Sequence, residues 1–197
     1  MEARLTQDST NDSYRSDLNH RKRLGQYFTG TKLARLLAYL ARTDNDGFAI
    51  DPMCGNGDMI EAIRSIAPSK QMYGIEIDKN TLKLCANRFK ATADKSYVHL
   101  IEGDAFSWDT ISRLKTYEYD LVITNPPYVR YQSLTGSAES IRRSLINIAE
   151  RLPSLTEEDR DIFVSIIKGY SGLSDLAVPS WILCAMLTKI GGKLAMV

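Results

Sequence analysis

The chain has 197 residues, of which 44% are hydrophobic and 25% are charged, and its formal net charge at pH 7 is +1. This length favours one domain with a sizeable core. The near-neutral net charge excludes a positive potential over the whole surface, so any surface that binds nucleic acid is local or supplied by another chain. The cysteines are scattered, which predicts neither a metal site nor a disulfide framework. The N-terminus is polar and no apolar run is long enough to span a bilayer, so we expect neither a secretory signal nor a membrane span. Together these features predict a soluble cytoplasmic protein.

The N-terminal segment, residues 1–24, is mostly polar and charged, which predicts a flexible arm that orders on binding a partner. Its basic cluster at residues 20–23 either contacts a phosphate backbone or is solvated, and solvation is the commoner case for such runs.

Helical and apolar patterns alternate from Thr31 onward. Leucines at positions 33, 36, 37 and 40 recur at helical spacing and predict a helix with one apolar stripe. A second helix begins at Asp58, with positions 59, 60, 63 and 66 facing inward, and a third covers residues 79–92. Short apolar runs predict strands at 48–50, 72–77, 97–101 and 119–124. This alternation predicts an α/β fold with a doubly wound, mainly parallel sheet.

A long helical insertion, residues 129–173, interrupts the alternation after the fourth strand. It holds two amphipathic patterns, 137–152 and 156–168, and excursions at the carboxyl edge of such a sheet usually cover or shape a site. A further helix at 175–190 and a fifth strand at 193–197 complete the predicted elements.

The most informative motif, Asn125-Pro126-Pro127-Tyr128, directly follows the fourth strand. Its two prolines lock the backbone and supply no amide hydrogens. The Asn125 amide oxygen and a backbone carbonyl can each accept one hydrogen from a planar NH2 group, while Tyr128 stacks on its plane. Proline-rich turns are common at strand ends, so this interpretation needs support from other motifs.

Three earlier strand ends carry residues that suit an adenosine. The loop Asp51-Pro52-Met53-Cys54-Gly55-Asn56-Gly57 precedes a helix, and its glycines let a ligand approach the helix N-terminus. Glu76 closes the second strand, where a carboxylate can bind both ribose hydroxyls. The third strand ends in Asp104-Ala105-Phe106, in which the carboxylate can accept from an adenine amine and the ring can stack. The glycine spacing of the first loop matches neither the motif of a dinucleotide site nor a Walker loop. S-adenosylmethionine (SAM), which has no phosphate, therefore fits better than a ligand that carries a pyrophosphate.

Together these motifs resemble the catalytic domain of the N6-adenine-specific DNA methyltransferases of the NPPY class. The segment Gly25-Gln26-Tyr27-Phe28-Thr29 resembles the family's leading motif, which usually continues with proline where this chain has Gly30. The motif order and the extension NPPYVRY resemble the group whose recognition domain follows the catalytic domain, including type II restriction-modification enzymes that fuse both activities.

The resemblance implies a Rossmann-like, class I SAM-dependent methyltransferase fold for residues 25–197, and a prokaryotic-type cytoplasmic protein. It implies that Tyr27, Phe28 and Thr29 lie over the methionine end of SAM, that Asp51 orders the loop, and that Ile77 packs on an adenine face. It further implies that an adenine of double-stranded DNA flips out and receives the methyl group by direct in-line transfer, often within a restriction-modification system.

Two alternatives and one gap remain open at this point. Protein glutamine methyltransferases also use NPPY, because a side-chain amide presents the same planar NH2 group, and ribosomal RNA methyltransferases use the motif too. A non-catalytic SAM-binding subunit is a further alternative. The family fold has seven strands and the sequence predicts five, so we expect a sheet apparently truncated after the fifth strand. A missing C-terminal region or a separate chain is then expected to supply the last strands and target recognition, and the isolated chain to methylate poorly.

Overall fold

The structure is a computed structural model that describes residues 29–41, 44, 46–90, 96–128, 138–169 and 176–197. The predicted N-terminal arm, Tyr27, Phe28 and the start of the helical insertion lie outside the described residues.

The described residues form one five-stranded sheet in the order β3-β2-β1-β4-β5, and all four neighbouring pairs are parallel. The strands are β1 Phe48–Asp51, β2 Gln71–Glu76, β3 Val98–Glu102, β4 Tyr119–Thr124 and β5 Thr188–Met196. The helices are α2 Thr31–Ala41, α3 Asp58–Ile66, α4 Lys79–Lys90, α5 Trp108–Ile111, α6 Ala138–Arg151, α7 Glu157–Gly169 and α8 Ala177–Leu187. The predicted doubly wound α/β sheet is confirmed, and every neighbouring pair is parallel.

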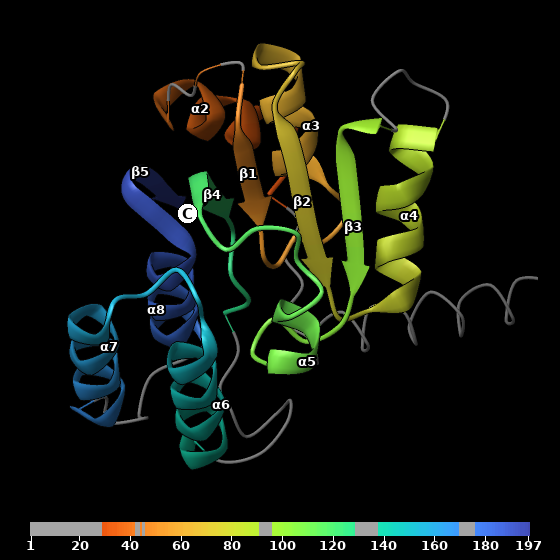
Figure 1. The fold of residues 1–197 in the computed structure, drawn as a ribbon. Helices are drawn as coiled ribbons and strands as arrows, with labels where there is room; N and C mark the ends of the chain where they lie inside the picture. The colour runs from red at the N-terminus through yellow and green to blue at the C-terminus, as the bar shows by residue number, and fades with distance from the viewer. Residues whose placement is uncertain (1–28, 42–43, 45, 91–95, 129–137, 170–175) are drawn as a thin grey trace, which may run out of the picture.

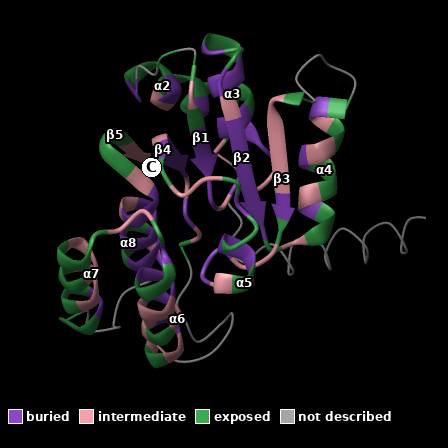
Figure 2. Cartoon of the chain, in the orientation of Figure 1, coloured by how far each residue is buried: buried purple, intermediate pink, exposed green. Residues whose placement is uncertain are grey.

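Helices cover both faces of the sheet (Figure 1). Helices α2, α3 and α4 share one apolar core with Ala49 and Leu121 of the central strands, whereas α5, α6 and α8 share another with Ile50 and Val122. Successive strand residues therefore face opposite cores, as the period of two along a strand requires. The central strands β1 and β2 are buried along almost their whole length (Figure 2).

Most of the leucine stripe of α2 faces outward, and only Leu37 packs against the core, although the helix itself is where the periodicity predicts it. Leu36 and Leu40 are 54% and 64% exposed, while Ala34 and Ala38 are fully buried. Small side chains let α2 lie close against α3, with which it makes extensive contact. In α3 the inward prediction is confirmed for all its apolar positions except Ile66, which is exposed at the last turn.

Strand β5 begins earlier than the sequence predicts. Helix α8 ends at Leu187 and the strand starts at Thr188, so the three residues assigned to the end of the helix belong to the strand. Thr188 pairs with Tyr119, and a register shift follows before Leu121 pairs with Lys193. Within the described ranges, no helix has the length and apolar character that crossing a bilayer requires.

Tyr119, the first residue of β4, provides a test of the core. Its side chain is fully buried and its ring packs edge-on against Tyr73, with 5.6 Å between centroids, but its hydroxyl has no hydrogen-bond partner among the described residues. Burying an unsatisfied polar group costs about 1–3 kcal/mol. We therefore expect Tyr119→Phe to leave the melting temperature unchanged or to raise it by a few degrees, as measured by circular dichroism.

The control is Tyr119→Leu, which removes the ring as well and should lower the melting temperature. A clear drop in the melting temperature of Tyr119→Phe would show that the hydroxyl is satisfied and would contradict the expectation.

Candidate functional site

The carboxyl ends of the parallel strands meet at one edge of the sheet. Asp51 at the end of β1 pairs with Gly74, and Glu76 at the end of β2 pairs with Glu102. The segments that follow these strands therefore lie together, which is where ligands bind in open α/β sheets.

Asp51 joins the loop after β1 to the end of β4. It is 1% exposed, and its Oδ1 accepts hydrogen bonds from the Thr124 hydroxyl at 2.7 Å and from the Met53 amide at 3.1 Å. Burial raises the pKa of this carboxyl from 3.8 to about 7, and the charges of Glu76 and Asp58 raise it further against the lowering effect of the two hydrogen bonds. A cation placed beside Asp51 would favour its ionised form.

Glu76 holds the glycine loop against the end of β2. Its Oε2 accepts from the Gly55 amide at 2.9 Å and its Oε1 from the Asp78 amide at 2.8 Å. Each carboxylate oxygen has a second lone pair, so these backbone bonds leave Glu76 able to accept from further donors. Gly57 has φ of 87°, and a Cβ at this position would lie 2.6 Å from the sulfur of Cys85 on helix α4. The backbone conformation and the close packing of α4 therefore both require glycine at position 57.

The residues after β3 are more buried than a stacking role alone would predict. Asp104 Oδ1 accepts from the Phe106 amide at 2.9 Å, and burial raises the pKa of the Asp104 carboxyl. Ala105 and the Phe106 ring pack within the apolar core, with Phe106 only 6% exposed. Ile77, after β2, is 48% exposed.

The motif after β4 places its polar and aromatic groups differently. Asn125 lines a pocket and its Oδ1 is buried in the wall. Pro126 is buried and Pro127 half-buried, so the prolines fix the turn from within. Tyr128 is 44% exposed, and its hydroxyl donates to the backbone carbonyl of Val197, which orients the ring beside the end of β5.

One pocket joins the loop after β1 to Asn125. It encloses about 250 Å³, part of it open to solvent. Its described lining residues are Thr29, Asp51, Met53, Cys54, Gly55, Asn56, Asp58, Met59 and Asn125. The lining includes two carboxylates and, among the described residues, no lysine or arginine, so it suits a cationic group and disfavours a phosphate.

Four residues predicted from the sequence line this pocket: Thr29, Asp51, Gly55 and Asn125. The other predicted site residues in the described ranges do not line it, namely Pro52, Gly57, Glu76, Ile77, Asp104, Ala105, Phe106, Pro126, Pro127 and Tyr128. The pocket is too small to enclose a whole nucleoside with a tail, so it would take only part of such a ligand.

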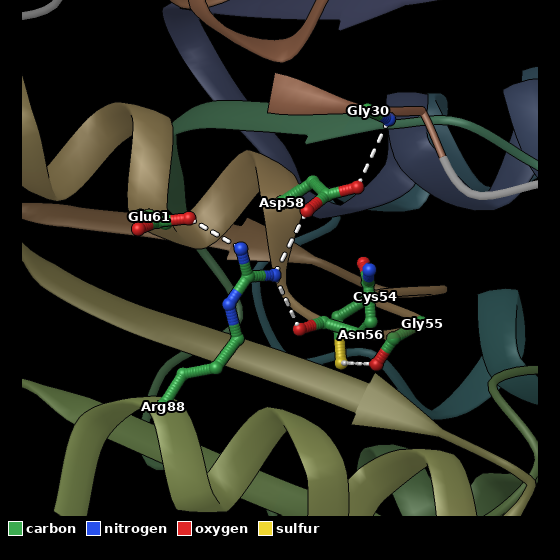
Figure 3. A network of polar contacts seen from close by, with 7 residues as sticks. All are labelled: Gly30, Cys54, Gly55, Asn56, Asp58, Glu61 and Arg88. Carbon is green, nitrogen blue, oxygen red and sulfur yellow. Dashed lines mark hydrogen bonds and ion pairs between the residues drawn. The ribbon is translucent and has the colours of Figure 1, made fainter.

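Sequence reasoning missed a polar network beside the pocket, drawn in Figure 3. Arg88 Nη1 donates to the Asn56 carbonyl and to Asp58 Oδ1, each at 2.8 Å, and Asp58 Oδ2 accepts from the Gly30 amide at 2.9 Å. The guanidinium also pairs with Glu61. An acidic residue directly after Gly57 at a helix start was the available signal for Asp58, because carboxylates favour that position. Nothing in the local sequence marks Arg88, which lies 30 residues away.

The chain is similar to several known proteins. The N-6 DNA Methylase family matches residues 15–148. The type II methyltransferase M.CvrRI of Paramecium bursaria Chlorella virus XZ-6E is 32% identical over 79 residues, which cover 40% of this chain and 18% of that protein. The release factor glutamine methyltransferase of Bifidobacterium longum is 34% identical over 85 residues, which cover 41% of this chain and 29% of that protein. The chain thus spans less than a third of the length of these curated relatives.

A solved structure with the same arrangement is the methyltransferase subunit of a type I restriction-modification system from Streptococcus thermophilus. It matches with a TM-score of 0.62 at 20% sequence identity, covering 88% of this chain and 35% of that chain. At this identity the likeness concerns the fold alone, and it confirms the predicted class I SAM-dependent methyltransferase fold.

The raised pKa of Asp51 predicts how stability varies with pH. Because the folded pKa of about 7 lies above the ordinary value of 3.8, the stabilising contribution is complete below about pH 4 and is lost as pH rises through about 7. Asp51→Asn keeps a side-chain oxygen but does not titrate. One pKa unit corresponds to about 1.4 kcal/mol. As the pH rises from about 4 to above about 7, we therefore expect the free energy of unfolding of the wild type to fall by roughly 4 kcal/mol relative to that of Asp51→Asn.

Urea unfolding at a series of pH values measures this difference. Asp109→Asn, an exposed carboxyl on α5, is the matched control. Parallel pH profiles for the wild type and Asp51→Asn would contradict the assignment.

Proposed function

This chain belongs to the N-6 DNA methylase family, and we propose that it transfers a methyl group from SAM to the exocyclic amino nitrogen of adenine in DNA. The observation that carries the proposal is the pocket in which Asn125, from the NPPY motif, and Gly55, from the loop after β1, line one cavity. A group bound by the loop and a group bound by Asn125 would be in contact there.

The pocket fits the charged tail of SAM. The sulfonium and the α-ammonium outweigh the α-carboxylate, so the tail has a net charge of +1. Asp51 supplies negative charge in a wall that no basic side chain among the described residues lines, and Asp58 supplies a carboxylate whose charge is partly offset by Arg88. We assign the methionine end to this pocket, with Thr29 and Gly55 in its walls. The adenosine would extend toward the neighbouring strand ends, with Glu76 at the ribose, Asp104 at the adenine amine, and Ile77 and Phe106 at the ring. Phe106 is only 6% exposed, so its ring can contact the adenine only through the small part that is accessible.

Bound SAM supplies an electrophilic methyl group. The chain's own contribution is to position the attacking nitrogen: the target adenine leaves the DNA stack, and Tyr128 stacks on its plane. Asn125 and the Pro126 carbonyl accept the two amino hydrogens, which concentrates the nitrogen lone pair for in-line attack. The nitrogen gains the methyl carbon as the carbon–sulfur bond breaks, and the resulting ammonium releases a proton to water. This scheme requires no general base.

No cysteine nucleophile enters this scheme. All three cysteines are buried. A hydrogen bond with Cys85, together with burial, raises the pKa of the Cys54 thiol well above its ordinary value, so the thiol beside the pocket stays protonated.

A second candidate substrate is a glutamine side chain, because the Bifidobacterium longum relative is a release factor glutamine methyltransferase. Its planar amide NH2 would use the same two acceptors. DNA is favoured because the family match is to DNA methylases, and the similar type II methyltransferase supports our proposal of a restriction-modification setting.

We also propose that further strands, with target recognition, pair with the free edge of β5. This strand is an edge of the sheet, and Ile190 within it is 94% exposed. Unprotected edge strands are uncommon in native proteins because they pair with other chains.

The test is Asn125→Ala, which removes one acceptor for the amino group. We expect SAM affinity, measured by calorimetry, to change by no more than a few fold, because the side chain contributes only part of one pocket wall. We expect transfer of radiolabelled methyl to double-stranded DNA to fall on the order of 100-fold or more, because the attacking nitrogen loses its orientation. Mass spectrometry should identify N6-methyladenine as the product.

The matched control is Asn80→Ala, an exposed asparagine on α4 that should change neither quantity. Labelling of glutamine-containing peptides instead of DNA would favour the second substrate. A wild-type chain that binds no SAM would overturn the proposed function, whereas SAM binding without transfer to either substrate would point to the non-catalytic alternative or to a requirement for the further strands.

A further inference from the structure

Thr29 lines the pocket, and the Thr29–Gly30 segment is held in place by a hydrogen bond that proline cannot make. The Gly30 amide donates to Asp58 Oδ2 at 2.9 Å. The leading motif that this segment resembles usually has proline at this position, and proline has no amide hydrogen. Gly30 also has φ of 74°, whereas proline is fixed near −65°. This chain therefore fixes the wall by a different device.

The Gly30 residue is fixed at both ends. Its carbonyl accepts from the Ala34 amide at 3.1 Å, in the first turn of α2, while its amide is bound to Asp58. Thr29, the preceding residue, lines the pocket. The position of the Thr29 side chain thus depends on how this one residue is held between α2 and α3.

Asp58 is itself oriented by Arg88. The carboxylate is 7% exposed, and a buried charge needs a partner with good geometry. Arg88 Nη1 donates to Asp58 Oδ1 at 2.8 Å, which leaves Oδ2 directed at Gly30 (Figure 3). The same nitrogen binds the Asn56 carbonyl, so the guanidinium fixes the glycine loop and the carboxylate together.

Helix α4 places Arg88 accurately. Cys85, one turn earlier on the same face, lies so close to Gly57 that a Cβ there would be 2.6 Å from its sulfur. This close packing leaves little freedom for the helix to shift against the loop.

We propose that Asp58, oriented by Arg88, is a positioning residue. It holds the Thr29–Gly30 segment in place and thereby determines the affinity of the pocket for the charged tail of SAM. This inference rests on the proposed function, because it takes SAM as the occupant of the pocket.

The experiment compares Asp58→Asn with the wild type using two ligands. SAM has the charged tail and adenosine lacks it, so a change in the wall should affect only SAM. Asp58→Asn also removes a charge from the pocket lining, and the Gly30 variants below separate the two effects because they leave that charge in place. We expect roughly tenfold weaker binding of SAM by calorimetry, corresponding to about 1.4 kcal/mol, and unchanged binding of adenosine. We also expect faster hydrogen exchange at the Gly30 amide, a readout that does not need a ligand.

Glu61→Gln is the matched control, because it removes the other carboxylate partner of Arg88 and touches neither Gly30 nor the pocket. Arg88→Ala should weaken SAM binding as Asp58→Asn does, and Arg88→Lys should partly restore it. If wild-type SAM binding is intact and Asp58→Asn leaves it unchanged, the inference is overturned. An equal loss of SAM and adenosine binding would also overturn it, because it would show a general structural defect.

A second pair of variants covers the case in which Asp58→Asn does not fold. Gly30→Pro removes the amide hydrogen, and Gly30→Ala keeps it; a Cβ at this position meets no atom within 4 Å, and both variants disfavour the positive φ. SAM should bind more weakly to Gly30→Pro than to Gly30→Ala, and equal affinities would contradict the proposal. A wild type that binds no SAM would overturn the proposed function and this inference with it.

Discussion

The hydrogen bond from the Thr124 hydroxyl to Asp51 joins the two halves of the candidate site. It connects residues 73 positions apart, one at the end of β1 and one at the end of β4, and it is buried. The loop that shapes the pocket follows Asp51, and the NPPY motif follows Thr124, so this contact fixes both starting points relative to one another. Parallel pairing of β1 and β4 brings the ends of the two strands side by side, and the hydrogen bond between Thr124 and Asp51 fixes the position of one end relative to the other. Glu76 extends the same arrangement to β2 by binding the Gly55 amide.

Much of the fold was predictable because the apolar strands and amphipathic helices differ in period along the sequence. Strand β4 was predicted at its observed bounds, since a short apolar run ends at the prolines. The outward leucines of α2 were not evident, because periodicity identifies an apolar stripe but not which small residues allow close helix packing. The early start of β5 was missed for a different reason: α8 passes into the strand without a glycine or proline to mark the boundary.

The candidate site divides in the same way. Residues that follow strands directly, such as Asp51 and Asn125, could be placed from the sequence because parallel strands bring their carboxyl ends together. Asp58 and Arg88 could not, because their pairing depends on how two helices pack. The burial of Phe106 likewise depends on side chains from α5 and α6 that share its core.

The acidic wall of the pocket has a consequence for turnover. Under the proposed function, the bound sulfur carries a positive charge before methyl transfer and none afterwards, while the charge on the α-ammonium is unchanged. The attraction exerted by Asp51 and Asp58 is therefore greater for the substrate form of the cofactor than for the demethylated form. The same carboxylates that favour entry would hold the cofactor less strongly once the reaction is complete, so charge alone would let the cavity discriminate between the substrate form of the cofactor and the demethylated form.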